Sequence, residues 1–331
     1  MTVLPETSVE STDRAVAILG IGRMATGLAV DLALNGCSVD VIDIKSRSET
    51  EQRDKAVGLL DELTRAAQQL GRDLTDLPPP VYCTAAVPGK NYAYLFEALP
   101  EEIAVKQAAY AAMGKTIAGA TALCSMTSTF TVEELTAGIE LPADMVVTHF
   151  MNPPWLVPFL EVVTPDEMND NNVDALFGFL RDTGHAPIRC KSSPGFVISR
   201  LQVALMNEAV RIMEEGVASP EDIDKAITHG WGYRFPIMGI LEFIDAGGLD
   251  ILHHAGHSVA EALNRPDLKS PALVGQKYAE GAYGTKTLKG LFDYGDGSQL
   301  AAREATRLDR QVRLKALLDQ FQAEEESDGE R

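Results

Sequence analysis

A glycine-rich turn near the N-terminus constrains the fold of this chain more than any other feature. The apolar run that starts at Ala15 (Ala-Val-Ala-Ile-Leu) leads into Gly-Ile-Gly-Arg-Met-Ala and then into a helical pattern. Gly20 permits a tight turn, and Gly22 lets the backbone approach a phosphate at the helix N-terminus. The motif alone is weak, but this order predicts an α/β fold with a doubly wound Rossmann-like sheet. The expected dinucleotide-binding residues are Gly20, Ile21, Gly22, Arg23 and Met24.

An acidic residue follows the second predicted strand. Residues 38–42 are apolar and strand-like, and Asp43 comes next, about 20 residues after the glycines, as in dinucleotide-binding folds. A carboxylate there accepts hydrogen bonds from the ribose hydroxyls and repels a 2′-phosphate, which favours NAD over NADP. Lys45 and Arg47 follow directly and keep NADP open as an alternative. A tight turn that binds no ligand is the structural alternative.

A histidine and an acid form the second informative pattern. An apolar run ends at His149, a turn carrying Asn152 follows, and the next apolar run, 159–163, contains Glu161. Burying a carboxylate costs several kcal/mol unless a partner stabilises it, and His149 is the nearest candidate. We therefore predict a dyad in which Glu161 orients the ring of His149 and the free ring nitrogen takes a proton. The alternative is a core histidine and an edge-strand glutamate.

The composition limits which functional classes of protein the chain can belong to. With 331 residues and 45% hydrophobic residues the chain can form two domains, and a formal charge of −19 argues against a nucleic-acid-binding face. No apolar run approaches the ~20 residues of a membrane span, and the polar N-terminus lacks a signal-peptide pattern, so we expect a cytoplasmic protein with no membrane partner. Widely spaced cysteines predict reduced thiols: Cys37, Cys83, Cys124 and Cys190.

The segment around the predicted dyad carries a family resemblance. His-Phe-x-Asn-Pro followed by Leu-Glu-Val-Val resembles the catalytic segment of the L-3-hydroxyacyl-CoA dehydrogenases, and the resemblance extends from about Ala15 to Tyr294. It implies that His149 is the base and that Glu161 orients it. The part Asn-Pro-Pro-Trp-Leu-Val-Pro looks more like relatives that oxidise free hydroxy acids, the carnitine and gulonate 3-dehydrogenases.

The same resemblance implies further site residues in the first half. Glu101 and Lys106 match an acidic and a basic residue that contact the cofactor, and Ser128 matches the serine that binds the substrate oxygen. We assign Asn152, together with Ser128, to holding the oxygen and the cofactor carboxamide. Local alternatives are a helix-dipole role for Glu101 and an N-cap role for Ser128 or Thr129 before a helix at 132–137.

In the second half, Ser-Pro-Gly-Phe at 193–196 opens a long helical segment to residue 215. There Ser199 replaces an asparagine that contacts substrate in the family. Arg234 lies in a glycine-rich turn and could hold a substrate carboxylate, or it could be a solvated loop arginine. Lys286 matches a lysine that reaches the cofactor.

Three more expectations concern single segments. The run 116–124 predicts a strand. The helix at 50–72 lacks the lysines that hold CoA phosphates in relatives, which counts against a CoA ester. No metal site is predicted, because His253, His254 and His257 lack an accompanying ligand motif.

The predicted domains are a flexible tail (1–13), an NAD-binding Rossmann-like domain (14–192), an all-α domain (193–321) and an acidic tail (322–331). The all-α domain would bind substrate and form a homodimer, as in relatives, with the site in the cleft between the domains. The predicted reaction is NAD-dependent interconversion of a (3S)-3-hydroxyacyl-CoA and its 3-oxoacyl-CoA. The alternatives are a dehydrogenase of a small free hydroxy acid with Arg234 as the carboxylate clamp, and a non-catalytic NADH-binding protein of the lens-crystallin kind.

Overall fold

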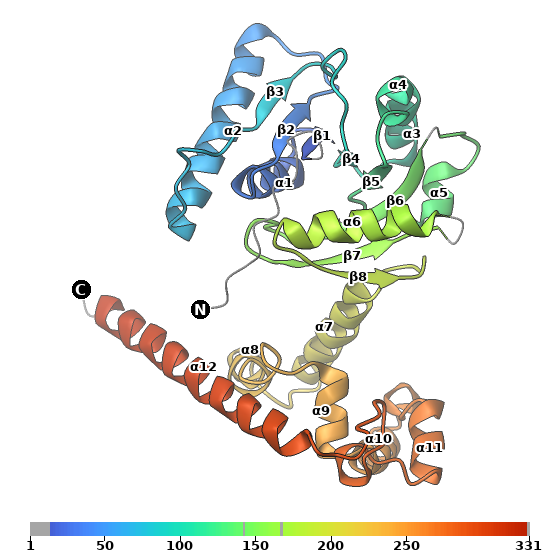
Figure 1. Ribbon diagram of the computed structural model, residues 1–331. Coiled ribbons are helices and arrows are strands. Elements are labelled where there is room, and N and C mark those ends of the chain that lie inside the picture. The colour runs from blue at the N-terminus through green and yellow to red at the C-terminus, as the bar shows by residue number, and fades with distance from the viewer. Residues whose placement is uncertain (1–13, 142, 166–167, 330–331) are drawn as a thin grey trace. The chain divides into compact units, whose positions relative to one another are not determined.

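The computed structural model describes residues 14–141, 143–165 and 168–329, which divide into two compact units between Leu205 and Met206 (Figure 1). The predicted N-terminal tail lies outside the described residues. The first unit contains a sheet flanked by helices, and the second is helical, so the predicted fold class is confirmed. Within the described residues, no helix is both long enough and apolar enough to cross a membrane.

Eight strands form one sheet in the order β3-β2-β1-β4-β5-β6-β7-β8. Neighbouring strands are parallel except β6 and β7, which are antiparallel. The chain runs outward in both directions from the boundary between β1 and β4, which is the switch point where ligands bind in such sheets. The strands are β1 (Ala15–Leu19), β2 (Ser38–Ile42), β3 (Val81–Cys83), β4 (Tyr94–Glu97), β5 (Ala122–Ser125), β6 (Asp144–Phe150), β7 (Phe159–Val163) and β8 (Ala186–Cys190).

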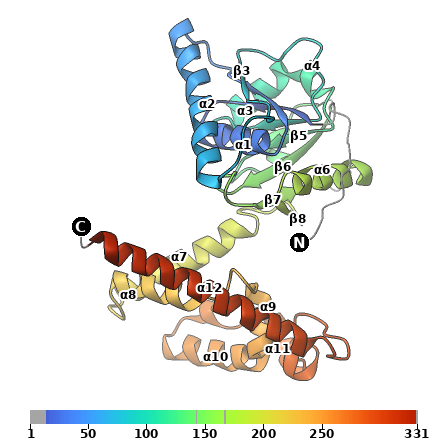
Figure 2. The ribbon, with the colours of Figure 1, turned by 60° about the vertical axis from the view of Figure 1, so that its left-hand side comes forward.

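Helices cover both faces of this sheet (Figure 2). In β1, Val16 and Ile18 point into one core and Ala17 and Leu19 into the other, because successive strand side chains alternate between faces. The first core is completed by α1 (Arg23–Leu34), α2 (Glu49–Leu70) and α6 (Asp170–Asp182). The second is completed by α3 (Ile103–Ala112), α4 (Gly114–Ile117) and α5 (Val132–Thr136).

The helix predicted at 50–72 is confirmed as α2. It starts with a capping box, in which the Ser48 side chain accepts from the backbone of Glu51 while the Glu51 side chain accepts from the backbone of Ser48. It ends at Gly71, which adopts a left-handed conformation with φ of 61°.

The strand predicted at 116–124 is partly wrong. Residues 114–117 form the short helix α4, and the chain then turns, with the N–H of Gly119 donating to Thr116 O and that of Ala120 to Ile117 O. Strand β5 therefore begins only at Ala122. A glycine between two apolar stretches favours a turn over a continuous strand.

The helical unit contains the second half of α7 (Ile198–Glu214) and the helices that follow it. Ser219 caps α8, and Pro220 occupies its first position. The last helix continues through the predicted acidic tail as far as Gly329. The remaining elements are α8 (Pro220–Lys225), a π-helical turn (Ala226–Trp231), α9 (Ile240–Gly247), α10 (Leu249–Ala262), α11 (Ala272–Ala279) and α12 (Leu300–Gly329), with short 3-10 turns at Pro266–Leu268 and Thr285–Thr287.

A buried carboxylate organises the segment after α11. Asp245 is fully buried and accepts hydrogen bonds from the backbone N–H of Leu291 and Phe292, each 2.9 Å, and from the Tyr294 hydroxyl at 3.0 Å. Burial and this bond to Asp245 raise the pKa of Tyr294 to about 12. These bonds hold the segment after α11, which includes Lys286, against α9.

Candidate active site

A cavity of about 700 Å³ opens at the switch point of the sheet. Its walls come from the turn after β1 (Gly20 to Met24), the segment after β2 (Asp43 to Arg47) and the segment after β4 (Ala98 to Pro100). The structure thus brings together the predicted turn Gly20, Ile21, Gly22, Arg23 and Met24 and the predicted acid Asp43.

The two glycines fit a dinucleotide for different reasons. Gly20 has a φ of +107°, and a Cβ there would lie 2.7 Å from the carbonyl oxygen of Ala98, so a larger residue would clash. Gly22 is the N-cap of α1 and has open space where a side chain would be. The first N–H groups of α1 have no side-chain cap, which suits the pyrophosphate of NAD.

Asp43 is buried at the end of β2 and accepts three hydrogen bonds. It accepts hydrogen bonds from the backbone N–H of Lys45 at 3.1 Å, from the Tyr82 hydroxyl at 3.1 Å and from Arg47 Nε. Burial acts to raise the pKa of this carboxyl, but the bonds from Arg47, Lys45 and Tyr82 hold it below its usual range. Asp43 is therefore an anion at neutral pH.

His149 and Glu161 lie opposite each other on β6 and β7. They are paired in the antiparallel register, and His149 Nδ1 lies 2.7 Å from Glu161 Oε2. The glutamate side chain is fully buried, while that of the histidine is 12% exposed. With Nδ1 turned toward the carboxylate, Nε2 is the ring nitrogen left to exchange a proton. The ring also packs against Phe196, with centroids 5.9 Å apart.

The second carboxyl oxygen of Glu161 is bound by the backbone that follows the Ser-Pro-Gly-Phe segment. Oε1 accepts from the backbone N–H of Val197 at 2.7 Å and of Ile198 at 2.8 Å, at the start of α7. Positive φ angles at Gly195 and Phe196 turn the chain so that these N–H groups face the carboxylate. These two N–H groups at the helix N-terminus provide hydrogen-bond partners for the buried oxygen of Glu161. The predicted substrate contact Ser199 follows directly in this first turn.

Glu101 anchors the loop that carries Ser128. Its Oε1 accepts from the hydroxyls of Thr127 and Thr129, the latter at 2.7 Å, and from the backbone N–H of Ser128 at 3.2 Å. Partial burial acts to raise the pKa of Glu101, but these hydroxyls and Lys106 lower it. The Ser128 side chain is exposed. Both local alternatives are wrong, because Glu101 precedes α3 and its N-cap, and Thr131 is the N-cap of α5.

Beneath this loop lies a buried ion pair that sequence reasoning missed. Glu97 is fully buried, and its Oε1 accepts from Lys106 Nζ at 2.8 Å and from the backbone N–H of Leu99 at 2.6 Å. Its Oε2 accepts from the hydroxyls of Tyr110 at 2.6 Å and Ser125 at 2.7 Å. An acid inside the apolar run Tyr-Leu-Phe-Glu is the same signal that singled out Glu161.

Lys106 connects this pair to the loop. Its side chain is only 1% exposed, and Nζ lies 2.8 Å from Glu97 and 3.2 Å from Glu101. It thus joins the ends of β4 and β5 through two carboxylates. Its contact with the cofactor stays a prediction.

Asn152 lines a second cavity, of about 490 Å³. It follows β6 and precedes Pro153, to which it is joined by a cis peptide bond. Arg23 also belongs to the wall of the cofactor cavity, so the two cavities adjoin there. The other residues around this second cavity are Thr26, Gly27, Glu62, Arg65, Gln69 and Trp155.

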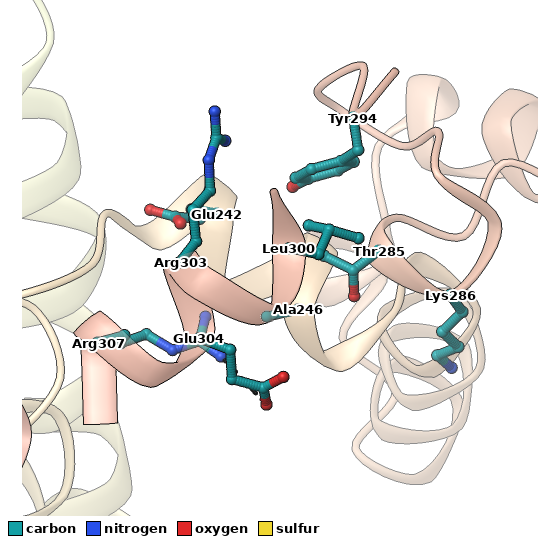
Figure 3. A pocket seen from close by; sticks show the side chains of 9 residues that line it. All are labelled: Glu242, Ala246, Thr285, Lys286, Tyr294, Leu300, Arg303, Glu304 and Arg307. Atoms are coloured by element: carbon teal, nitrogen blue, oxygen red, sulfur yellow. Dashed lines mark ion pairs between the residues drawn. The ribbon is translucent and has the colours of Figure 1, made fainter. Parts of the chain in front are cut away.

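The remaining predicted residues belong to the helical unit. Arg234 is exposed, donates to the carbonyl of Gly230 at 3.1 Å and lies over the ring of Phe243 at 5.6 Å. Figure 3 shows Lys286 at the edge of a cavity of about 260 Å³ between α9 and α12. Its Nζ is paired with Asp250 at 2.7 Å. Their contacts with substrate and cofactor stay predictions.

The three histidines of α10 have other partners. The His253 ring stacks on Tyr278 at 4.3 Å, and His257 Nδ1 lies 2.7 Å from the carbonyl oxygen of His253. Across the described ranges, no group of three His, Cys, Asp or Glu residues has a geometry that could hold a metal ion.

Comparison with known proteins gives matches along most of the chain. Residues 15–193 match the family model of the 3-hydroxyacyl-CoA dehydrogenase NAD-binding domain, and residues 195–294 match that of the 3-hydroxyacyl-CoA dehydrogenase C-terminal domain. These matches meet next to the predicted domain boundary, whereas the compact units divide inside α7.

Relatives of two substrate types are similar to the chain. The 5-formyl-3-hydroxy-2-methylpyridine 4-carboxylate 5-dehydrogenase of Mesorhizobium japonicum is 30% identical over 92% of this chain and 98% of its own. The 3-hydroxyadipyl-CoA dehydrogenase of Escherichia coli is 32% identical over 96% of this chain, which spans 65% of that protein. The crystal structure of a 3-hydroxyacyl-CoA dehydrogenase from Archaeoglobus fulgidus matches with a TM-score of 0.71 and 25% identity, over 92% of this chain and 99% of the other.

Proposed function

The chain belongs to the 3-hydroxyacyl-CoA dehydrogenase family, and we propose that it oxidises the hydroxyl of a secondary alcohol with NAD and with His149 as the base. The observation that carries this proposal is the His149–Glu161 pair at 2.7 Å, with both glutamate oxygens bound and one imidazole nitrogen free. When bound, NAD accepts the hydride from the carbinol carbon.

The proton follows a short path in this proposal. His149 Nε2 takes the hydroxyl proton of the substrate, and the carboxylate of Glu161 stabilises the imidazolium that results. The two N–H groups at the start of α7 hold the carboxyl group of Glu161 in place. Ser128 and Asn152 hold the substrate oxygen and the cofactor carboxamide, and Glu101 fixes the Ser128 loop.

The first substrate candidate is a (3S)-3-hydroxyacyl-CoA thioester, interconverted with its 3-oxoacyl-CoA. Both family models that match the chain describe enzymes of that type, and the Escherichia coli relative is named for such a substrate. Ser199 would then take the place of the family's asparagine as a substrate contact.

A small free hydroxy acid is the second candidate, and the charges on α2 favour it. The first turn of α2 carries Glu49 and Glu51, and its exposed face continues with Asp54 and Asp61. Exposed Arg53, Lys55 and Arg65 on the same helix offset most of these charges, so α2 presents no net positive surface to the phosphates of CoA. The Mesorhizobium relative, named for a pyridine carboxylate, aligns over almost its whole length. Arg234 would then hold the substrate carboxylate.

Absorbance at the NADH band separates these candidates. Purified protein is tested for reduction of acetoacetyl-CoA and for oxidation of carnitine, gulonate and 3-hydroxybutyrate. If the thioester is the substrate, acetoacetyl-CoA turns over at least ~10-fold faster, as kcat/KM, than any free acid. Activity on a free acid alone would replace the first candidate with the second, and Arg234→Met should then raise KM for that acid. Tight NADH binding without turnover would indicate a crystallin-like binding protein.

A further inference from the structure

The ribose end of the cofactor cavity carries more positive charge than an NAD site requires. Arg47, Lys45 and Lys55 line the cavity there together with Asp43. These three cations outnumber Asp43 among the charged residues that line this end, although the whole chain carries −19 and Glu51 also interacts with the charge of Arg47. An acid at the end of β2 on its own would repel a 2′-phosphate.

Asp43 repels a 2′-phosphate only weakly, because its partners already use most of its acceptor positions and offset its charge. Its Oδ2 accepts from Arg47 Nε and from the Tyr82 hydroxyl, and its Oδ1 accepts from the Lys45 N–H. A carboxylate has about four acceptor positions, so three are used before a ribose arrives. The side chain is 2% exposed, and the guanidinium paired with it offsets its charge.

Arg47 is suited to bind an anion while it holds Asp43. A guanidinium carries five N–H groups. The one on Nε is used on Asp43 and the Tyr82 hydroxyl also interacts with the guanidinium, so the N–H groups that remain on the Nη atoms can bind a ligand. Paired N–H groups of this kind match the oxygens of a phosphate. Arg47 is 19% exposed and lies just before Ser48, the N-cap of α2, while its carbonyl accepts from Gln52 at 3.0 Å. Its backbone is therefore anchored.

We propose that Arg47, supported by Lys45 and Lys55, forms a binding position for the 2′-phosphate of NADP, so that the protein binds NADP as well as NAD. Arg47 keeps its Nε on Asp43 and presents its Nη atoms to the phosphate. The ribose hydroxyls of NAD use the remaining acceptor position of Asp43. This inference concerns cofactor binding alone and does not depend on the substrate or on His149.

Binding measurements test it without any turnover. NADH and NADPH are titrated by their fluorescence, and ADP and 2′,5′-ADP are used as competitors that differ in the 2′-phosphate. For the native protein, Kd for NADPH should lie within about tenfold of Kd for NADH. Arg47→Ala should weaken NADPH and 2′,5′-ADP about tenfold or more relative to NADH and ADP, the size expected for one charge-assisted interaction.

Arg53→Ala is the matched control, because Arg53 is an exposed arginine on α2 that does not line the cavity. It should leave the ratio of the two Kd values unchanged. NADH binding by each variant reports that the cofactor domain is folded. The proposal is overturned if native protein binds NADPH more than about tenfold more weakly than NADH, or if Arg47→Ala weakens both cofactors equally or NADH more. If Arg47→Ala weakens both cofactors equally, or NADH more, Arg47 only positions Asp43 for the ribose of NAD.

Discussion

Replacing His149 with glutamine is expected to lower kcat by about 10² to 10⁴, the usual contribution of a positioned general base. The glutamine amide can still hydrogen-bond to Glu161, which stays bound to the N–H groups of Val197 and Ile198. An amide does not take up a proton near neutral pH, so the hydroxyl proton of the substrate has no acceptor. NADH affinity should change little, because His149 does not line the cofactor cavity.

The control for this variant is His254→Gln, which changes an exposed histidine of the helical unit. It should keep the native kcat. Steady-state rates on the best substrate and NADH titrations would be measured for both variants. If His149→Gln turned over at a rate close to native while NADH still bound, His149 would not be the base.

Replacing Lys106 with methionine should destabilise the sheet unit by about 3–5 kcal/mol, because it leaves a buried carboxylate without its cation. Glu97 would keep the Leu99 N–H and the hydroxyls of Tyr110 and Ser125, but none of these carries a charge. Lys106→Met combined with Glu97→Gln removes both charges and should recover part of the loss.

Tryptophan fluorescence during urea denaturation can report the unfolding of the sheet unit alone. The chain has two tryptophans, Trp155 in the sheet unit and Trp231 in the helical unit, so a Trp231→Phe background leaves Trp155 as the reporter. Lys115→Met replaces an exposed lysine and is the matched control, with a change within about 0.5 kcal/mol. The account would be contradicted if Lys106→Met lowered the free energy of unfolding no more than Lys115→Met does. It would also be contradicted if the losses from Lys106→Met and Glu97→Gln were fully additive in the double variant.

Much of the sheet could be predicted because its signals are local. Residues 38–42 form a strand with the predicted bounds, since they are a short strand-like run that ends before polar residues. Contact between His149 and Glu161 could be inferred from a buried acid that needed a partner. The backbone donors of Glu161 could not, because they come from residues 36 and 37 positions further along the chain.

Other features depend on tertiary contacts or on weak local patterns. Strand β3 has three residues and lies at the sheet edge, where pairing with β2 rather than a long apolar run defines it. Glu97 carried a visible signal, but its partners Tyr110 and Ser125 are distant in sequence. The segment predicted as an acidic tail continues the helix α12 to Gly329.

The central claim is that this chain moves a hydride from a carbinol carbon to NAD with His149 as the base. The most direct measurement uses the alcohol form of the compound that turns over in the substrate panel (for acetoacetyl-CoA, the matching 3-hydroxyacyl-CoA), labelled with deuterium at its carbinol carbon, and follows the mass of the reduced cofactor. The account predicts NADH one mass unit heavier, formed at least ~10²-fold more slowly by His149→Gln. Reduced cofactor without deuterium, or NADH binding with no reduced cofactor from any of these alcohols, would contradict it.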